Sequence, residues 1–171
     1  QTKLLHFVLH LKVNNMLEYK WIPEGVIDDS FRNIRIDVFV KEQGVCEEAE
    51  FDDFDMHVPH LVIFLDDEAV ATGRIIPYGK DAVKLGRIAV KKDKRGLGLG
   101  EKVVLELLRK AKEDGAKTVC IGAQTHAVGF YEKCGFARSH VVKNFFIDNY
   151  DHPIIEDGVQ LVDMIYLQRR I

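Results

Sequence analysis

Short apolar runs separated by polar turns follow one another along most of the chain, and their spacing predicts the secondary structure. Runs rich in β-branched residues are typical of strands, which we expect at 16–22, 59–66, 68–78, 83–90 and 118–123. Asp66-Asp67 separates two of these runs and indicates a hairpin. The end of the chain, including 159–167, is expected to form antiparallel strands, with a turn-rich interruption from Asn144 to Gly158.

Apolar residues at helical spacing predict three helices. The first is capped by Asp28 or Ser30 and ends near Gln43-Gly44; its apolar positions are Phe31, Ile34 and Val38. The second ends at Gly115, and its apolar positions are Val103, Val104, Leu107, Leu108 and Ala111. The third is short, covers 126–134 and ends at Gly135. The acidic segment 46–58 has no regular period, so we expect a loop there.

The order of these elements indicates one α/β (α+β) domain with a mixed sheet, from residue 16 to residue 171. Residues 1–15 are expected to form an extension outside this core, because MLEYKWI at Met16 resembles a natural beginning. The composition, 47% hydrophobic and 30% charged, is typical of a soluble globular protein. No apolar run approaches the roughly 20 residues that span a bilayer, and polar residues interrupt LLHFVLHLKV, which argues against a signal peptide. Three cysteines without a CxxC pair indicate reduced thiols and a cytoplasmic location.

The charges are unevenly distributed. A net charge of only −3 argues against strong nucleic-acid binding. From Glu42 to Gly73 there are ten acidic residues and no Lys or Arg, whereas Arg74 to Lys117 holds thirteen Lys or Arg and six acids. Two interpretations stay open: ordinary solvated surfaces, or a site for two substrates, one cationic and one phosphorylated.

A glycine-punctuated helix start, KRGLGLGEK, follows the strand at 83–90 and suggests a phosphate site. It is not a Walker loop, because Gly100 is followed by Glu101 and Lys102 rather than by Lys and a hydroxyl residue. It is not a dinucleotide fingerprint either, because Val103 stands where GxGxxG requires the third glycine. Glycines here let backbone N–H groups approach an anion at the positive end of a helix.

The pattern that does fit is [Q/R]xxGx[G/A], filled by Arg95, Gly98 and Gly100, and with it the chain resembles the GNAT superfamily of N-acetyltransferases. GFYEKCGF at 129–136 is similar to a second motif of that family. RIDVFVKEQG at 35–44 and GAQTHAVGFYEKCGF resemble the branch that contains ElaA and YjcF-like proteins. The resemblance covers about 16–167 and implies a mixed, largely antiparallel central sheet flanked by helices on both faces.

The resemblance also implies acetyl-CoA as cosubstrate, with the pyrophosphate held by the glycine loop and the pantetheine arm along the strand before it. The residues expected to contact it are Ile88, Ala89, Val90, Arg95, Gly96, Leu97, Gly98, Leu99, Gly100, Glu101, Gln124, Phe130 and Tyr131. Tyr131 matches the family tyrosine that acts as general acid at the coenzyme sulfur. Many family members dimerise through sheet edges, which leaves a homodimer open, although no feature of the sequence indicates one.

The general base is less clearly marked. Many family members carry a glutamate on the strand before the loop, but here that stretch is LGRIAV and its charged residue is Arg87. Glu42 and His126 are therefore the candidates for the base, and deprotonation of the amine through water is an equal alternative. His57 and His60 beside Asp52, Asp53 and Asp55 fit no closed zinc pattern, so we expect no metal.

We therefore expect an N-acetyltransferase that moves the acetyl group of acetyl-CoA to a primary amine by direct attack in a ternary complex. The acidic segment favours a small cationic acceptor, since clustered carboxylates attract an ammonium group. The alternative is a non-catalytic acyl-CoA-binding regulatory module, which the missing strand glutamate keeps open.

Overall fold

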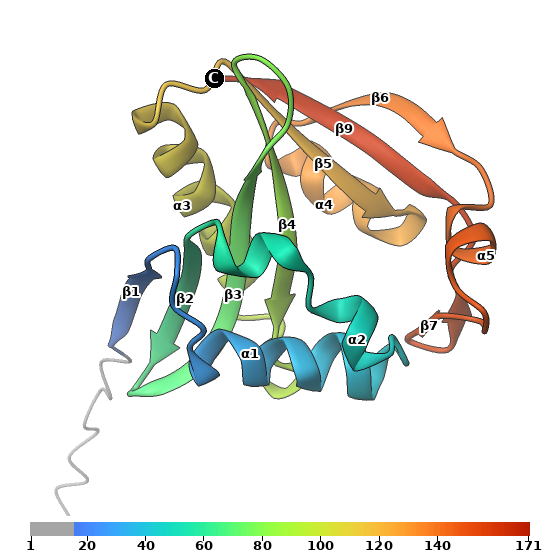
Figure 1. Ribbon diagram of the computed structural model, residues 1–171, viewed down its shortest axis with the longest axis horizontal. Coiled ribbons are helices and arrows are strands. Elements are labelled where there is room, and N and C mark those ends of the chain that lie inside the picture. Colours follow the sequence, from blue (N-terminus) through green and yellow to red (C-terminus); the bar gives the residue numbers. More distant parts are fainter. Residues whose placement is uncertain (1–15) are drawn as a thin grey trace, which may run out of the picture.

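The computed structural model describes residues 16–171, which form a seven-stranded sheet with the order β1-β2-β3-β4-β5-β9-β6 (Figure 1). The strands are β1 (Leu17–Ile22), β2 (His60–Leu65), β3 (Glu68–Pro77), β4 (Ala82–Val90), β5 (Thr118–Gln124), β6 (Ala137–Val142), β7 (Ile155–Glu156), β8 (Val159–Gln160) and β9 (Met164–Arg170). The helices are α1 (Asp29–Arg35), α2 (Glu47–Glu50), α3 (Leu99–Glu113), α4 (Val128–Lys133) and α5 (Phe145–Asn149). The expected extension at 1–15 lies outside the described residues.

The sheet is mixed and largely antiparallel, as predicted. Each neighbouring pair is antiparallel except β4 and β5, which run parallel and are connected through α3. Asp66 and Asp67 both have positive φ (50° and 67°), which matches the right-handed twist of the strands that they join and forms the predicted hairpin between β2 and β3.

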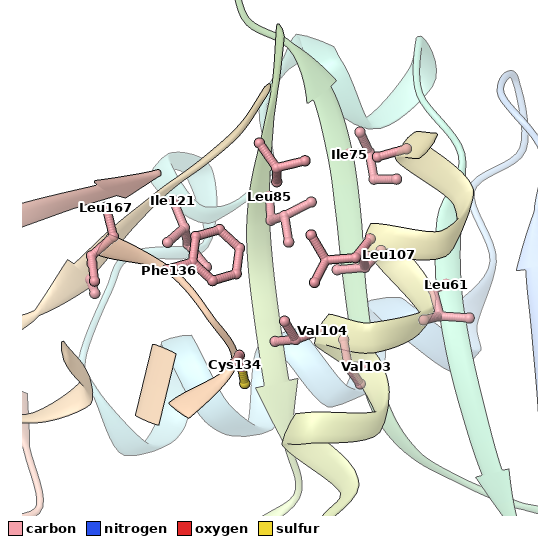
Figure 2. Close-up of a cluster of buried hydrophobic side chains, with 14 of the residues drawn as sticks. Leu61, Ile75, Leu85, Val103, Val104, Leu107, Ile121, Cys134, Phe136 and Leu167 are labelled. Atoms are coloured by element: carbon pink, nitrogen blue, oxygen red, sulfur yellow. The ribbon is translucent and has the colours of Figure 1, made fainter. Parts of the chain in front are cut away.

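Helices cover both faces of the sheet. The apolar side of α3 packs on one face, where Val103, Val104 and Leu107 lie against side chains of β2, β3 and β4 (Figure 2). Phe136 and Ile121 continue this core toward β9 (Figure 2). A Cβ on Gly73 of β3 would lie only 2.9 Å from the side chains of Leu107 and Val103, so a glycine there lets the helix approach the strand.

The first helix covers the opposite face. The Asp28 side chain accepts a hydrogen bond from the Ser30 N–H (2.8 Å), which identifies Asp28 as the cap, and Phe31 and Ile34 pack on Val62. Beyond Arg35 the helix widens into a π-helix, Ile36–Glu42, and it ends at Gln43-Gly44 as predicted. Widened turns of this kind are frequent at functional sites.

The acidic segment 46–58 is not the loop that we expected. It contains α2 and a 3₁₀ turn, Asp53–Met56, in which the Asp52 carboxylate caps the Phe54 N–H and the Asp55 carboxylate accepts from the Asp52 N–H. Elements of one turn leave no hydrophobic period in the sequence, so their caps and their buried partners define them instead.

The end of the chain matches the expectation in part. The turn-rich interruption also contains α5 and β7, and the antiparallel strands expected at the end of the chain are present in two parts: β8, which pairs with β7, and β9, which pairs with β5 and β6. Leu161 ends the first part because it is buried in a small apolar cluster with Ile154 and Phe146, and its N–H bonds the Ile154 carbonyl.

Candidate active site

The site begins where two parallel strands separate. β4 and β5 pair only over Ala82–Leu85 and Thr118–Ile121, and then diverge (Figure 1). A bulge at Arg87, which has a φ of 52°, interrupts the register with β3 at this point. Within residues 16–171, the segment from Ile88 to Val90 has a strand neighbour only on the β3 side. Its other edge therefore presents backbone N–H and C=O groups to a ligand.

The glycine loop lies at the end of the same strand. Gly98 has a φ of 73°, a conformation that strains any residue with a Cβ, and α3 begins at the next residue without a side-chain cap. The first N–H groups of a helix have no partner inside the helix. Those of Leu99, Gly100 and Glu101 can therefore bind an anion, which the helix dipole also favours.

Arg95 and Glu42 meet beside this loop. The Arg95 guanidinium donates to the Glu42 carboxylate over 2.9 Å and to the Val90 carbonyl over 3.3 Å. The structure thus places Glu42, a candidate base, against the loop cation. Glu42 does not line either of the two cavities described next.

Two cavities meet at the separated strands. The loop cavity is lined by Ile88, Ala89, Val90, Arg95, Gly100 and Phe130. The aromatic cavity is lined by Phe39, Tyr131, Phe145, Phe146, Tyr150 and Tyr166. Phe39, Gln43, Ile88 and Gln124 line both. Because these four residues are shared, ligands in the two cavities would meet at the bulge of β4.

The structure brings most of the expected contact residues together. Ile88, Ala89, Val90, Arg95, Gly100, Gln124 and Phe130 line the loop cavity, and Tyr131 lines the aromatic cavity beside it. The remaining expected residues, Gly96, Leu97, Gly98, Leu99 and Glu101, belong to the loop and to the first turn of α3 without lining a cavity wall. The Leu99 side chain is buried in the core, so only its backbone can face a ligand.

Tyr131 is held by aromatic neighbours. Its ring packs edge-to-face on Phe130 and Phe136, with centroids 4.9 and 6.2 Å away. Burial raises its pKa well above the usual value, and the nearby Cys134 and Glu156 add to the effect. The hydroxyl therefore keeps its proton at neutral pH and is able to donate it.

Glu156 is a site residue that the sequence did not reveal. It lines the loop cavity, and its carboxylate accepts a hydrogen bond from Gln43 Nε2 over 2.8 Å. His126 Nε2 lies 2.9 Å from the other carboxylate oxygen, as an ion-pair contact outside hydrogen-bond alignment. Burial raises the pKa of Glu156, while His126 and Arg95 act in the opposite direction. In the sequence it is one more acid before an Asp-Gly turn, and only the fold brings it to Gln43.

The acidic segment is largely neutralised inside the protein. Arg35, with no exposed surface, binds Glu50 over 2.7 Å and Asp55 over 2.6 Å. Arg74 binds Asp52 and Asp55, both over 2.5 Å, and Arg87 lies 3.2 Å from Glu50. Three of the carboxylates expected to attract a cationic ligand are thus already paired with arginines.

Two further features concern metals and membranes. Among residues 16–171, no group of three or more His, Cys, Asp or Glu side chains is arranged to hold a metal ion. In the same range, no helix is both long enough and apolar enough to cross a membrane. His60 is stacked on Phe31 with ring centroids 4.0 Å apart, and its Nε2 bonds the Asp55 carbonyl.

Comparison with known proteins agrees with this geometry. The model of the acetyltransferase (GNAT) family matches residues 29–136. YjcF of Bacillus subtilis (strain 168), an uncharacterized N-acetyltransferase, is 38% identical over 114 residues, covering 66% of this chain and 79% of the relative. A Bacillus subtilis acetyltransferase in complex with CoA has a TM-score of 0.78 at 25% identity, covering 91% of this chain and 99% of that one. Escherichia coli ElaA has a TM-score of 0.71 at 25% identity, covering 91% and 100%. The chain belongs to the acetyltransferase (GNAT) family and is an N-acetyltransferase of that family.

Proposed function

We propose that this protein binds acetyl-CoA in the loop cavity and transfers its acetyl group to a primary amine that enters through the aromatic cavity. The observation that carries the proposal is the meeting of the two cavities at the β4 bulge, beside the uncapped N-terminus of α3. Both substrates would be present together, and the amine would attack the thioester directly.

The residues of the loop cavity fit acetyl-CoA. The N–H groups of Leu99, Gly100 and Glu101 would hold the pyrophosphate, with Arg95 as a cation beside it. Gly100 lines this cavity beside the Phe130 ring and Val90, so the first turn of α3 lies next to the end of β4. The free edge from Ile88 to Val90 would hydrogen-bond the pantetheine arm, and an N–H at the bulge would polarise the carbonyl. When bound, acetyl-CoA supplies a thioester that a neutral amine can attack.

The protonated amine must lose a proton before it attacks, since an alkyl amine has a pKa near ~10. Glu156 is our proposed base, because it is half-buried in the wall of the loop cavity, is bound to Gln43, which lines both cavities, and has a raised pKa that suits proton transfer. His126 would pass the proton on to solvent, since its side chain is half exposed and touches Glu156. In this mechanism His126 acts through Glu156. Glu42 is not the base but positions Arg95.

Tyr131 would act as general acid on the departing thiolate. Its hydroxyl is protonated at neutral pH because burial raises its pKa. The Tyr131 side chain lines the aromatic cavity, and its neighbour Phe130 lines the loop cavity. The acid and the base would then stand on different elements, Tyr131 on α4 and Glu156 on β7.

The acceptor is a small molecule or a single side chain. The aromatic cavity has a volume of about 210 Å³, below the roughly 300–1,000 Å³ typical of sites for drug-sized ligands. A cationic acceptor was expected from the acidic segment, but the carboxylates of Glu50, Asp52 and Asp55 are paired with arginines. That segment therefore no longer supports a cationic acceptor over other amines.

Thermal melting with acetyl-CoA, ATP and NAD tests the cosubstrate. A ligand that binds only the folded state raises the melting temperature by mass action, and we expect acetyl-CoA alone to do so. Gly98→Ala should reduce this shift, because its φ of 73° becomes strained and the loop amides move. Gly25→Ala is the matched control, since Gly25 has a φ of 80°, equally open surroundings and no place at either cavity. The assignment of the loop as the acetyl-CoA site would be wrong if all three ligands shifted the melting temperature equally. It would also be wrong if acetyl-CoA gave equal shifts in the Gly98→Ala and Gly25→Ala variants.

A further inference from the structure

The lining of the aromatic cavity contains a lysine with aromatic neighbours. Lys84 lines the cavity, and its ammonium lies 4.9 Å from the centre of the Tyr166 ring and 5.9 Å from that of Tyr78. Its one hydrogen bond is a long contact of 3.4 Å to the Tyr166 hydroxyl. No carboxylate of the described part of the chain lies within 4.0 Å of this ammonium. Lys84 is thus a half-buried cation whose charge is stabilised by the faces of the Tyr166 and Tyr78 rings rather than by a carboxylate.

The other charges of the cavity do not compensate for it. Glu50 and Arg87 also line the wall, but the Glu50 carboxylate is bound by Arg35 over 2.7 Å and lies 3.2 Å from Arg87. The Arg87 guanidinium also donates to the Glu50 carbonyl over 3.0 Å. The lining thus holds two cations and one carboxylate, and that carboxylate is already shared between two arginines. An oxyanion that enters would find its partner at Lys84.

The position of Lys84 sets the distance between this charge and the reaction. Lys84 lies four positions before Ile88 on β4, and Ile88 is the strand residue that lines both cavities. At about 3.3 Å per residue these four steps span at most roughly 13 Å, because the bulge at Arg87 shortens the strand. The lysine side chain can extend over part of this distance. A ligand that touches both places therefore carries its two polar groups at opposite ends of an apolar body.

We propose that the acceptor of this enzyme is an amine that carries an oxyanion at its far end, with Lys84 as the residue that binds the oxyanion. The apolar body would lie between Tyr166 and the aromatic side chains of α5, while the amine reaches the β4 bulge. This inference rests on the proposed function, since it describes the substrate that enters the second cavity of the same site.

The test compares matched amines that differ only in the distant group. With acetyl-CoA held constant, kcat/KM is measured for benzylamine, 4-(aminomethyl)benzoate and 4-(aminomethyl)benzylphosphonate. We expect kcat/KM for one or both of the oxyanion compounds to be at least tenfold higher than for benzylamine. The compound with the higher kcat/KM shows whether the site prefers a carboxylate or a phosphate-like group. Lys84→Met should abolish this preference. Lys84→Glu should invert it, so that the diamine 4-(aminomethyl)benzylamine becomes the better substrate.

Two controls separate the possible failures. Lys112→Met removes an exposed lysine of α3, on the opposite face of the sheet, and should keep the preference of the unaltered enzyme. Gly86 lines the same cavity, and a Cβ there meets nothing within 4 Å, so Gly86→Val should fold normally and lower the rates of all amines. If benzylamine reacts as fast as the oxyanion compounds, or if Lys84→Met leaves their ratio unchanged, the inference is wrong while the proposed function stands. If no amine of the set accepts an acetyl group, both fail together.

Discussion

Glu156 Oε2 lies 2.9 Å from His126 Nε2, and this contact joins the short β7-β8 hairpin to the turn that precedes α4. Gln43, at the end of the π-helix, holds the other carboxylate oxygen. Three segments that are distant in the sequence thus fix one carboxylate in the wall of the loop cavity, against Gln43, which lines both cavities. A carboxylate fixed in this way is suited to take a proton from an incoming amine.

Glu156→Gln should lower kcat roughly 10²-fold or more, the usual loss when a general base is removed. A base works only when deprotonated, so the rate of the unaltered enzyme should fall as pH drops through the raised pKa of Glu156. The variant should lose this acidic limb of its pH–rate profile. Asp157→Asn removes a like charge that raises the pKa of Glu156, so it should move the limb to lower pH. A limb that stays in place in both variants would remove Glu156 from the mechanism.

Tyr131→Phe should lower kcat by roughly 10²-fold, because the departing thiolate loses its proton donor. Acetyl-CoA affinity should change little, since Phe retains the edge-to-face packing on Phe130 and Phe136. The measurement is steady-state turnover together with the acetyl-CoA-dependent shift in melting temperature. Equal turnover of the two proteins would exclude the hydroxyl from the reaction.

Glu42→Gln distinguishes a positioning residue from a base. The Glu42–Arg95 pair is partly exposed, with 25% and 36% of the side-chain surfaces accessible, and such pairs contribute about 0–1 kcal/mol. We therefore expect the KM for acetyl-CoA to rise by at most about fivefold, with kcat and the pH–rate profile unchanged. Glu68→Gln, which breaks comparable contacts with Lys91 and Lys94, serves as the control and should alter neither quantity. A collapse of kcat in Glu42→Gln alone would restore Glu42 as the base.

The arginines of α1 provide a paired test of the buried charges. Arg35 and Arg32 each pair with a glutamate of α2, and each lies over the Phe51 ring, at 4.6 and 4.7 Å. They differ in burial, because Arg35 is fully buried whereas the side chain of Arg32 is 39% exposed. Arg35→Met leaves Glu50 and Asp55 with less compensation and should reduce the free energy of unfolding by about 3–5 kcal/mol. Arg32→Met should cost less than about 1 kcal/mol in the same urea titration. Equal losses would mean that burial does not set the strength of these pairs.

The sequence predicts those parts of the fold that local patterns determine. The strands before Gln124, the helix α3 and the glycine loop follow from residues within about fifteen positions of one another, so period and turn chemistry are sufficient. The motif with Arg95, Gly98 and Gly100 could be recognised for the same reason.

The remaining features depend on partners distant in the sequence. Glu156 meets Gln43 across 113 positions, and Arg74 binds Asp52 across 22. A count of acids and bases cannot show such pairing, so the acidic segment suggested an open cation site. The short elements α2, α5 and β7 were missed because each is five residues or fewer and leaves no period to detect.

Direct transfer of the acetyl group requires that both substrates occupy the joined cavities at once. Initial rates with acetyl-CoA and an amine, each varied at several fixed levels of the other, test it most directly, together with mass spectrometry of the enzyme after incubation with acetyl-CoA alone. We predict intersecting double-reciprocal lines and an enzyme without an added acetyl group. Parallel lines, with one acetyl group on the protein that a later amine removes, would reveal a covalent intermediate and contradict this account.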